Sequence, residues 1–289
     1  MSKYIDLHFH SIYSEGSLTP NEIITIAKKH GVAAMALTDH NTISGVNDFL
    51  IHAKKQKIKA ITGVEIYATW RKNIYHILGY NFDPKNSWLK ASLEELCADR
   101  LRAVENALYV VQKKGLKVDM KDMWNTKSHY IGFGQIMKWL EKYPENIKRF
   151  KKDLKTEMPG FFDIINFYFK KGRKPLLDET ALPVKTVFAM ITKAGGIPVL
   201  AHPGKQLTWE QDKIVEQLKN QGLKGLEVIS PHHNWSEVEH YLWLAKKHNL
   251  KITGGSDFHN PLIYKGKNAI KYQWQYQKPP YMLFQQLMR

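Results

Sequence analysis

Short apolar runs alternate with amphipathic segments along the first 80 residues. The runs that predict buried strands lie at 4–9, 32–38, 58–66 and 73–80, the last two paired as a hairpin. Between the first two runs, Thr19 followed by Pro20 and Glu22 predicts the start of a helix that ends near Gly31. Asn41 predicts the start of a second helix. Strands that alternate with helices in this way predict a parallel β/α architecture.

This alternation stops after Asp83-Pro84 and resumes about 100 residues later. Residues 86–114 predict one long helix, and residues 116–180 are irregular, aromatic and basic, with short helical stretches. Further strands are predicted at 197–201, 225–229 and 252–255, with helices at 183–194, 209–221 and 236–248. We therefore expect an α/β domain built from residues 1–95 and 184–289, interrupted by a helical, basic insertion at 96–183 that forms a substrate cap.

Composition narrows the class of protein. The 289 residues are 43% hydrophobic, enough for a sizeable core, and the single Cys97 excludes an intrachain disulfide or a Cys-rich zinc site. We find no secretion signal and no apolar run of membrane-spanning length, so we expect a cytoplasmic protein with no membrane partner and no obligate protein partner.

The net charge of +16 is unevenly distributed. Residues 1–95 carry a net charge of +2, whereas 96–183 and 184–289 carry +7 each. Such a surface attracts nucleic acids and phosphorylated small molecules, although a lysine-rich solvated surface explains the same numbers. The aromatic residues of the insertion, Trp124, Tyr130, Phe133 and Trp139, fit either a core or a base-stacking surface.

Histidines and carboxylates gather where the predicted strands end. These residues are His8, His10, Asp39, His40, Glu65, His76, His202, Asp257 and His259. In a β/α barrel the carboxyl ends of the strands form one face, so these side chains would converge. His8 and His10 point the same way along a strand and can chelate one cation. Imidazoles and carboxylates without thiolates suit Zn²⁺, Mn²⁺ or Fe²⁺, and Glu65 could bridge two ions. The remaining histidines are treated mostly as structural.

Six segments together resemble the PHP (polymerase and histidinol phosphatase) family. They are Asp6-Leu-His-Phe-His-Ser, Leu37-Thr-Asp-His-Asn-Thr, Gly63-Val-Glu-Ile, His76-Ile-Leu-Gly, Val199-Leu-Ala-His-Pro-Gly and Gly255-Ser-Asp-Phe-His. The resemblance covers nearly the whole chain and is closest to the bacterial branch of nucleoside 3′,5′-bisphosphate phosphatases and 5′→3′ exoribonucleases. It implies a distorted (β/α)₇ barrel with a helical insertion and two or three divalent metal ions (Mn, Fe or Zn).

The resemblance also implies a ligand set. The first metal would take His8, His10, Glu65 and Asp257; the second Glu65, His76 and His202; the third His40, His259 and Glu15, where the family has an aspartate. Asp39 would orient a ligating imidazole. A hydroxide bridging the first two metals would attack phosphorus, with Glu65 and Asp257 in catalytic positions and His259 as a possible proton donor.

One segment departs from the family. Relatives carry Arg and His where this chain reads Gly132-Phe133-Gly134-Gln135, so a phosphate clamp is missing there. Candidate replacements that would contact substrate are Arg102, His129, Lys205 and His233.

Three functions remain open on these grounds. We expect a metal-dependent phosphoesterase, a hydrolase that acts on nucleotides or short 5′-phosphorylated oligonucleotides. The alternatives are a monoesterase for a small metabolite, as in histidinol phosphatases, and a non-catalytic metal- or nucleic-acid-binding module.

Overall fold

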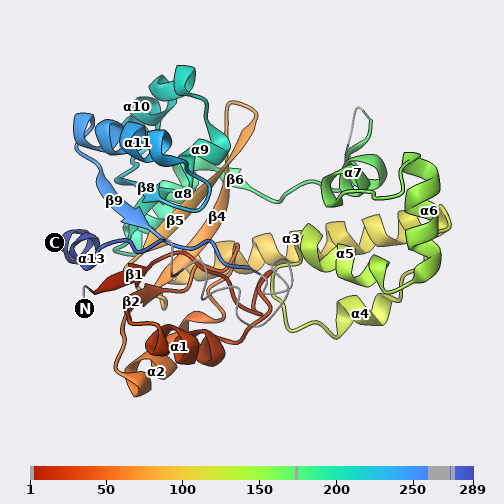
Figure 1. The fold of residues 1–289 in the computed structure, drawn as a ribbon, viewed down its shortest axis with the longest axis horizontal. Coiled ribbons are helices and arrows are strands. Elements are labelled where there is room, and N and C mark those ends of the chain that lie inside the picture. The colour runs from red at the N-terminus through yellow and green to blue at the C-terminus, as the bar shows by residue number, and fades with distance from the viewer. Residues whose placement is uncertain (1–2, 173–174, 260–273, 275–276) are drawn as a thin grey trace. The chain divides into compact units, whose positions relative to one another are not determined.

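The computed structural model describes residues 3–172, 175–259, 274 and 277–289 and divides the chain into two compact units (Figure 1). The first unit combines Met1–Glu94 with Ala181–Arg289 and is a mixed α/β structure. The second unit, Glu95–Thr180, is helical. Among the described residues, no helix is both long and apolar enough to cross a membrane.

The strands of the first unit form two sheets, ordered β1-β2-β3 and β6-β4-β5-β7-β8-β9. Their bounds are β1 Tyr4–Asp6, β2 Val32–Ala36, β3 Lys59–Ile61, β4 Gly63–Trp70, β5 Asn73–Tyr80, β6 Leu182–Pro183, β7 Ile197–Leu200, β8 Gly225–Ile229 and β9 Lys251–Gly254. Most neighbours are parallel, but β5 is antiparallel to both β4 and β7. The single strand predicted at 58–66 is therefore wrong, because the chain passes from one sheet to the other at Thr62.

Hydrogen bonds connect the two sheets at two places. Next to β1, the amide of Leu7 donates to the carbonyl of Gly254 at 3.1 Å, and that of His10 to Phe258 at 2.8 Å. Beyond β2, the amide of Asn41 donates to the carbonyl of Glu65 at 2.7 Å. These contacts bring the ends of β1, β2 and β9 to the same place as Glu65 on β4.

Helices pack on the sheets of this unit (Figure 1). Their bounds are α1 Pro20–Lys29, α2 Val46–Gln56, α8 Val184–Lys193, α9 Pro203–Gln206, α10 Asp212–Gln221, α11 Trp235–Lys247 and α13 Tyr281–Leu287. The start of α1 follows the prediction, since Thr19 and Glu22 form the capping box. The predicted start of a helix at Asn41 is wrong. The Asn41 side chain accepts from the amide of Tyr67 at 3.0 Å, which fixes this segment as a loop before α2.

Core packing sets the positions of the polar residues that follow the strands. Leu7, Leu78, Val199 and Ala201 belong to one buried apolar cluster. His8 and His202 directly follow two members of this cluster, Leu7 and Ala201. Because a close-packed core tolerates little movement, the imidazoles are held in defined places.

The second unit has its own core. Its helices are α3 Ser87–Lys113, which begins in the first unit, α4 Met120–Trp124, α5 Phe133–Glu141, α6 Pro144–Leu154 and α7 Phe161–Ile165, followed by a π-helical turn at Asn166–Lys170. Tyr130 and Phe133 are buried, and Trp139 packs against the same apolar cluster. The core interpretation of these three aromatic residues is correct, whereas Trp124 is 58% exposed.

The buried side chain of Arg100 connects several segments of this helical unit. Its Nε donates to the carbonyl of Ile131 at 2.7 Å, and its Nη1 to that of Asp178 at 2.7 Å. Nη1 also lies 3.2 Å from the carboxylate of Glu179. One fully buried side chain therefore holds together three segments that are distant in sequence.

Replacement of this side chain should destabilise the protein. We expect Arg100→Met to lower the free energy of unfolding by about 3 kcal/mol, because it leaves two main-chain carbonyls without their donor and removes the positive charge beside the Glu179 carboxylate. Urea denaturation followed by circular dichroism measures the change. Arg102→Met is the matched control: its side chain is 67% exposed, so a change within about 0.5 kcal/mol is expected. Equal midpoints for both variants would contradict the structural role of Arg100.

Candidate metal centre

Glu65 lies at the centre of a buried polar cluster. Its Oε2 is 3.3 Å from Nε2 of His8, 3.3 Å from Nε2 of His10 and 3.0 Å from Nδ1 of His40. Despite these neighbours, the fully buried Oε2 has no partner in hydrogen-bonding geometry within the described part of the chain. An anionic oxygen buried in this state is costly, and a cation among the three nitrogens relieves the cost. The cluster therefore fits a metal.

The other oxygen of Glu65 faces two further imidazoles. Oε1 is 2.9 Å from Nδ1 of His76 and 3.2 Å from Nε2 of His202. Leu78 on β5 stands opposite Glu65 on β4, so His76, two residues away, lies on the same face of this antiparallel pair. The sequence predicted that Glu65 ends its strand. That prediction is wrong, because β4 continues to Trp70.

Asp257 supplies the second carboxylate. Its Oδ1 lies 3.3 Å from Nε2 of His8 and 3.2 Å from Nε2 of His10. Its Oδ2 lies 2.6 Å from Nε2 of His232 and 3.9 Å from Nζ of Lys205. One oxygen thus faces the buried imidazoles, and the other faces two side chains at the edge of the cluster.

Backbone strain accompanies two of these positions. Asp257 has a φ of 46° and His202 a φ of 23°, both in the left-handed region of the backbone that residues other than glycine rarely adopt. The amide of Asp257 donates to the carbonyl of His8 at 2.7 Å, and that of His202 to Glu227 at 2.8 Å. Strain of this kind costs about 1–3 kcal/mol per residue and persists where surrounding contacts fix the conformation.

His259 completes the cluster on the side of His10 and His40. Its Nε2 lies 3.2 Å from Nε2 of His40, and its ring stacks on that of His10 with centroids 4.0 Å apart. Its Nδ1 donates to the carbonyl of Asp257 at 2.8 Å. Nε2 therefore remains directed towards the other imidazoles.

Three sets of ligand atoms lie close enough to hold one ion each, with all atoms of a set within 4.8 Å. They are His8, Glu65, His202 and Asp257; His10, His40 and His259; and His40, Glu65 and His76. Every ligand predicted from the sequence is included except Glu15, which lies half-buried in the loop before α1. Imidazoles and carboxylates without thiolates are the donor set of Zn²⁺, Mn²⁺ and Fe²⁺ sites.

The surroundings raise the pKa of some of these imidazoles and lower the pKa of others. Burial lowers the pKa of His10, but the hydrogen bond to Asp257 and the negative charges of Asp257 and Glu65 offset this and raise it to about 9. Burial dominates at His40 and His202, whose pKa values fall to about 3 and 4. Burial raises the pKa of Glu65, yet the imidazoles of His40, His8 and His76 around it hold it well below its usual range. The cluster is thus a charged carboxylate with neutral and protonated imidazoles.

Metal binding should consequently depend on pH. Below about pH 9, His10 carries a proton in the metal-free protein, and a metal must displace that proton before it can bind. Affinity for Mn²⁺ or Zn²⁺ is therefore expected to rise with pH between about 6.5 and 9, with protons released on binding at pH 7. Isothermal titration calorimetry in buffers of different ionisation enthalpy measures this release. Binding at pH 7 without proton release would contradict the pKa assigned to His10.

Glu227 is a functional candidate that the sequence analysis missed. This fully buried residue of β8 accepts a hydrogen bond from Nδ1 of His8 at 2.9 Å and another from the amide of His202. A carboxylate on the far nitrogen of a ligating imidazole fixes its tautomer and orientation. The available signal was a single acidic residue within the apolar run Gly225–Ile229.

Two adjacent histidines, His232 and His233, differ from the roles expected for them. Nδ1 of His233 donates to the carbonyl of Val228 at 2.7 Å, and its Nε2 accepts from the amide of Gly204 at 3.0 Å. Both nitrogens are thus used by the main chain, which argues against the predicted substrate contact of His233. His232, treated as structural, instead reaches Asp257 and is 32% exposed.

Asp39 also has a different role from the predicted one. Its Oδ1 accepts from the amide of Ser11 at 2.8 Å and the hydroxyl of Ser14 at 2.6 Å, and its Oδ2 from the hydroxyl of Ser11 at 2.7 Å. The prediction that it orients an imidazole is therefore wrong, since its acceptors are used to hold the loop that follows His10.

The remaining predicted substrate contacts fall in different places. Lys205 lies beside Asp257, as described above, and is half-exposed. Arg102 pairs with Asp99, and His129 is exposed, and both belong to the helical unit. Of these three residues, Lys205 is the one for which the structure shows an ion pair with a carboxylate of the cluster, that of Asp257.

A family model named PHP domain matches residues 6–193. The chain belongs to the PHP domain family. The family predicted from the six motifs is therefore confirmed.

Two relatives of this PHP protein are named for the hydrolysis of phosphate esters. It is 28% identical over 270 residues to a 3′,5′-nucleoside bisphosphate phosphatase of Chromobacterium violaceum, with 89% of this chain and 87% of the relative covered. It is 30% identical over 282 residues to a 5′-3′ exoribonuclease of Haemophilus influenzae, with 93% and 95% covered. A crystal structure from Bifidobacterium adolescentis shares the fold of the PHP protein, with a TM-score of 0.76 at 22% identity over 99% of this chain and 96% of that one.

Proposed function

We propose that this PHP protein is a metal-dependent phosphoesterase that hydrolyses nucleotides or short 5′-phosphorylated oligonucleotides. The observation that carries the proposal is the carboxylate of Glu65, with five imidazole nitrogens between 2.9 and 3.3 Å from its two oxygens. The two relatives, a 3′,5′-nucleoside bisphosphate phosphatase and a 5′-3′ exoribonuclease, support the substrate class.

Two or three divalent ions would be held by the three sets of ligands. Glu65 belongs to two of these sets, and His40 belongs to one of those two and to the third set. Bound divalent ions supply a nucleophile at neutral pH and stabilise negative charge on the phosphoryl oxygens. Burial and the nearby His10 hold the pKa of His259 well below its usual range, so a neutral His259 suits a ligand better than a proton donor.

The chain's own side chains would bind the phosphate and handle the leaving group. Lys205 brings a positive charge to the edge of the cluster, where it can contact a phosphate oxygen. His232 holds its Nε2 2.6 Å from Asp257 at the exposed edge, a position from which a proton can reach a leaving oxygen. We also infer that the helical unit, with its excess of Lys and Arg, serves as a cap for the substrate.

The fold itself is proposed to be the distorted (β/α)₇ barrel of the family. The hydrogen bonds that join Leu7 to Gly254 and Asn41 to Glu65 support closure, because they connect the two sheets at two separate places. An experimental structure of the first unit tests this.

Turnover of a substrate panel tests the proposed activity. The panel comprises a nucleoside 3′,5′-bisphosphate, a nucleoside monophosphate, a short 5′-phosphorylated RNA and histidinol phosphate, each in Mn²⁺ with and without chelator. Chelator-sensitive release of phosphate or nucleotide from the first three supports the proposal, and Asp257→Asn is the inactive control. Turnover of histidinol phosphate alone would favour the small-metabolite monoesterase. No turnover by a metal-loaded protein would contradict an enzymatic role on these substrates.

A further inference from the structure

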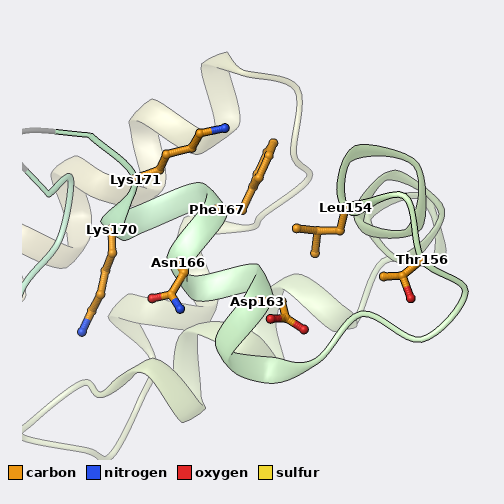
Figure 2. A pocket seen from close by; sticks show the side chains of 7 residues that line it. All are labelled: Leu154, Thr156, Asp163, Asn166, Phe167, Lys170 and Lys171. Atoms are coloured by element: carbon orange, nitrogen blue, oxygen red, sulfur yellow. The ribbon is translucent and has the colours of Figure 1, made fainter.

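The helical unit contains a hollow that the metal centre does not use. Its volume is about 700 Å³, within the range of small-molecule sites. Figure 2 shows the side chains that line it: Leu154, Thr156, Asp163, Asn166, Phe167, Lys170 and Lys171. They come from the end of α6, from α7 and from the π-helical turn that follows.

Phe167 separates this hollow from a second one. The second hollow has a volume of about 540 Å³ and is lined by Lys114, Phe167, Tyr168, Lys171, Pro175 and Leu176. The ring of Phe167 is half-buried, and in Figure 2 it stands between Lys171 and Leu154. The exposed Lys171 places its Nζ 4.5 Å from the centre of the ring and covers one face of it, so a stacking ligand would take the place of this flexible side chain. Two adjoining hollows with one aromatic wall suit a ligand made of repeated units.

The lining is positively charged. Lys114, Lys170 and Lys171 have no ion pair with a carboxylate among the described residues. Asp163 is the acidic residue in the lining, and its Oδ2 already accepts the amide of Gly160 at 3.1 Å as a helix cap. Three lysines against one carboxylate give the lining of the two hollows a net positive charge, which favours an anionic ligand.

The local backbone is also unusual. The turn Asn166–Lys170 is π-helical and carries three of the lining side chains. Insertions of this kind in α-helices are rare and frequently occur at functional sites, because the wider turn changes the direction of the side chains. Here the turn presents an aromatic ring, an amide and a lysine on one short segment.

We propose that these two hollows form an accessory site for a single-stranded oligonucleotide. A base stacks on Phe167, and backbone phosphates are bound by Lys114, Lys170 and Lys171. This site uses no residue of the metal centre and does not depend on the phosphoesterase activity. It gives the helical unit a way to hold a nucleic-acid strand at a second point.

The test is binding of a short, fluorescently labelled, single-stranded RNA to the full chain in chelator, where metal-dependent hydrolysis is prevented. Fluorescence anisotropy is measured for Phe167→Leu, which keeps an apolar side chain against the core, and Phe167→Tyr, which keeps the aromatic face. We expect binding about tenfold weaker for Phe167→Leu and unchanged for Phe167→Tyr. Thermal melts confirm that both variants are folded.

The charge is tested separately. The double variant Lys170→Ala/Lys171→Ala should reduce the slope of log affinity against log salt by about 1.4, since each phosphate contact to a single strand contributes about 0.7. Lys148→Ala/Lys152→Ala removes the same charge from exposed positions of α6 and should leave the slope unchanged. The proposal is overturned if wild type does not bind, if both lysine pairs act alike, if Phe167→Leu binds as wild type, or if an acidic peptide of equal charge competes equally well.

Discussion

Glu65→Gln is expected to lower kcat/KM for phosphoester hydrolysis by about 10³-fold or more, equivalent to about 4 kcal/mol of transition-state stabilisation. The amide has nearly the same volume, but it removes the negative charge that faces five imidazoles and is shared by two of the three ligand sets. The metal content of the purified variant, measured by mass spectrometry, should fall together with the activity.

A matched control separates this effect from a general loss of stability. Glu239→Gln makes the same chemical change on an exposed position of α11 and should leave both metal content and kcat/KM unchanged. If Glu65→Gln retained wild-type activity and metal content, the cluster would not be the metal centre, and the proposed reaction would need another site.

Glu227→Gln should weaken metal binding by about 10- to 100-fold without removing a ligand. Glu227 reaches two candidate ligands, through Nδ1 of His8 and through the amide of His202. Loss of its charge makes the His8 imidazole a weaker donor and loosens the strained turn at His202. Activity measured against increasing Mn²⁺ should therefore show a higher half-saturating concentration, with kcat largely recovered in excess metal.

The recovery distinguishes a positioning residue from a ligand. Glu65→Gln should not be rescued by excess Mn²⁺, whereas Glu227→Gln should be. Glu216→Gln, on an exposed position of α10, is the control for the substitution and should behave as wild type. An unchanged metal dependence of Glu227→Gln would show that the hydrogen bond to His8 has no influence on the site.

Local signals in the sequence predicted the elements that local interactions determine. The capping box at Thr19 and Glu22 marks the start of α1 because both partners lie within one turn. The segment at Asn41 has a similar signal, but its side chain bonds to Tyr67, which is distant in the sequence. No pattern within the segment contains that information, so the predicted helix began too early.

The same distinction holds for the candidate site. Strand ends rich in His and carboxylates predicted eight residues that the structure gathers into three sets. Which of His232 and His233 faces the cluster depends on the main chain around Val228 and Gly204, and sequence spacing does not determine it. Asp39 and Glu227 were misjudged or missed for a similar reason, because their partners lie on other segments.

The contact between His10 and Asp257 joins residues 247 positions apart. During synthesis, the half of the centre formed by His8, His10, His40, Glu65 and His76 is made long before the other half. Contacts this distant form slowly, since a long loop must close before they contribute. A partly made chain, even one that contains all of the family-matched residues 6–193, lacks His202 and Asp257. If the cluster holds metal as proposed, tight retention of metal would report that β9 has joined β1, and it would distinguish finished molecules from incomplete ones.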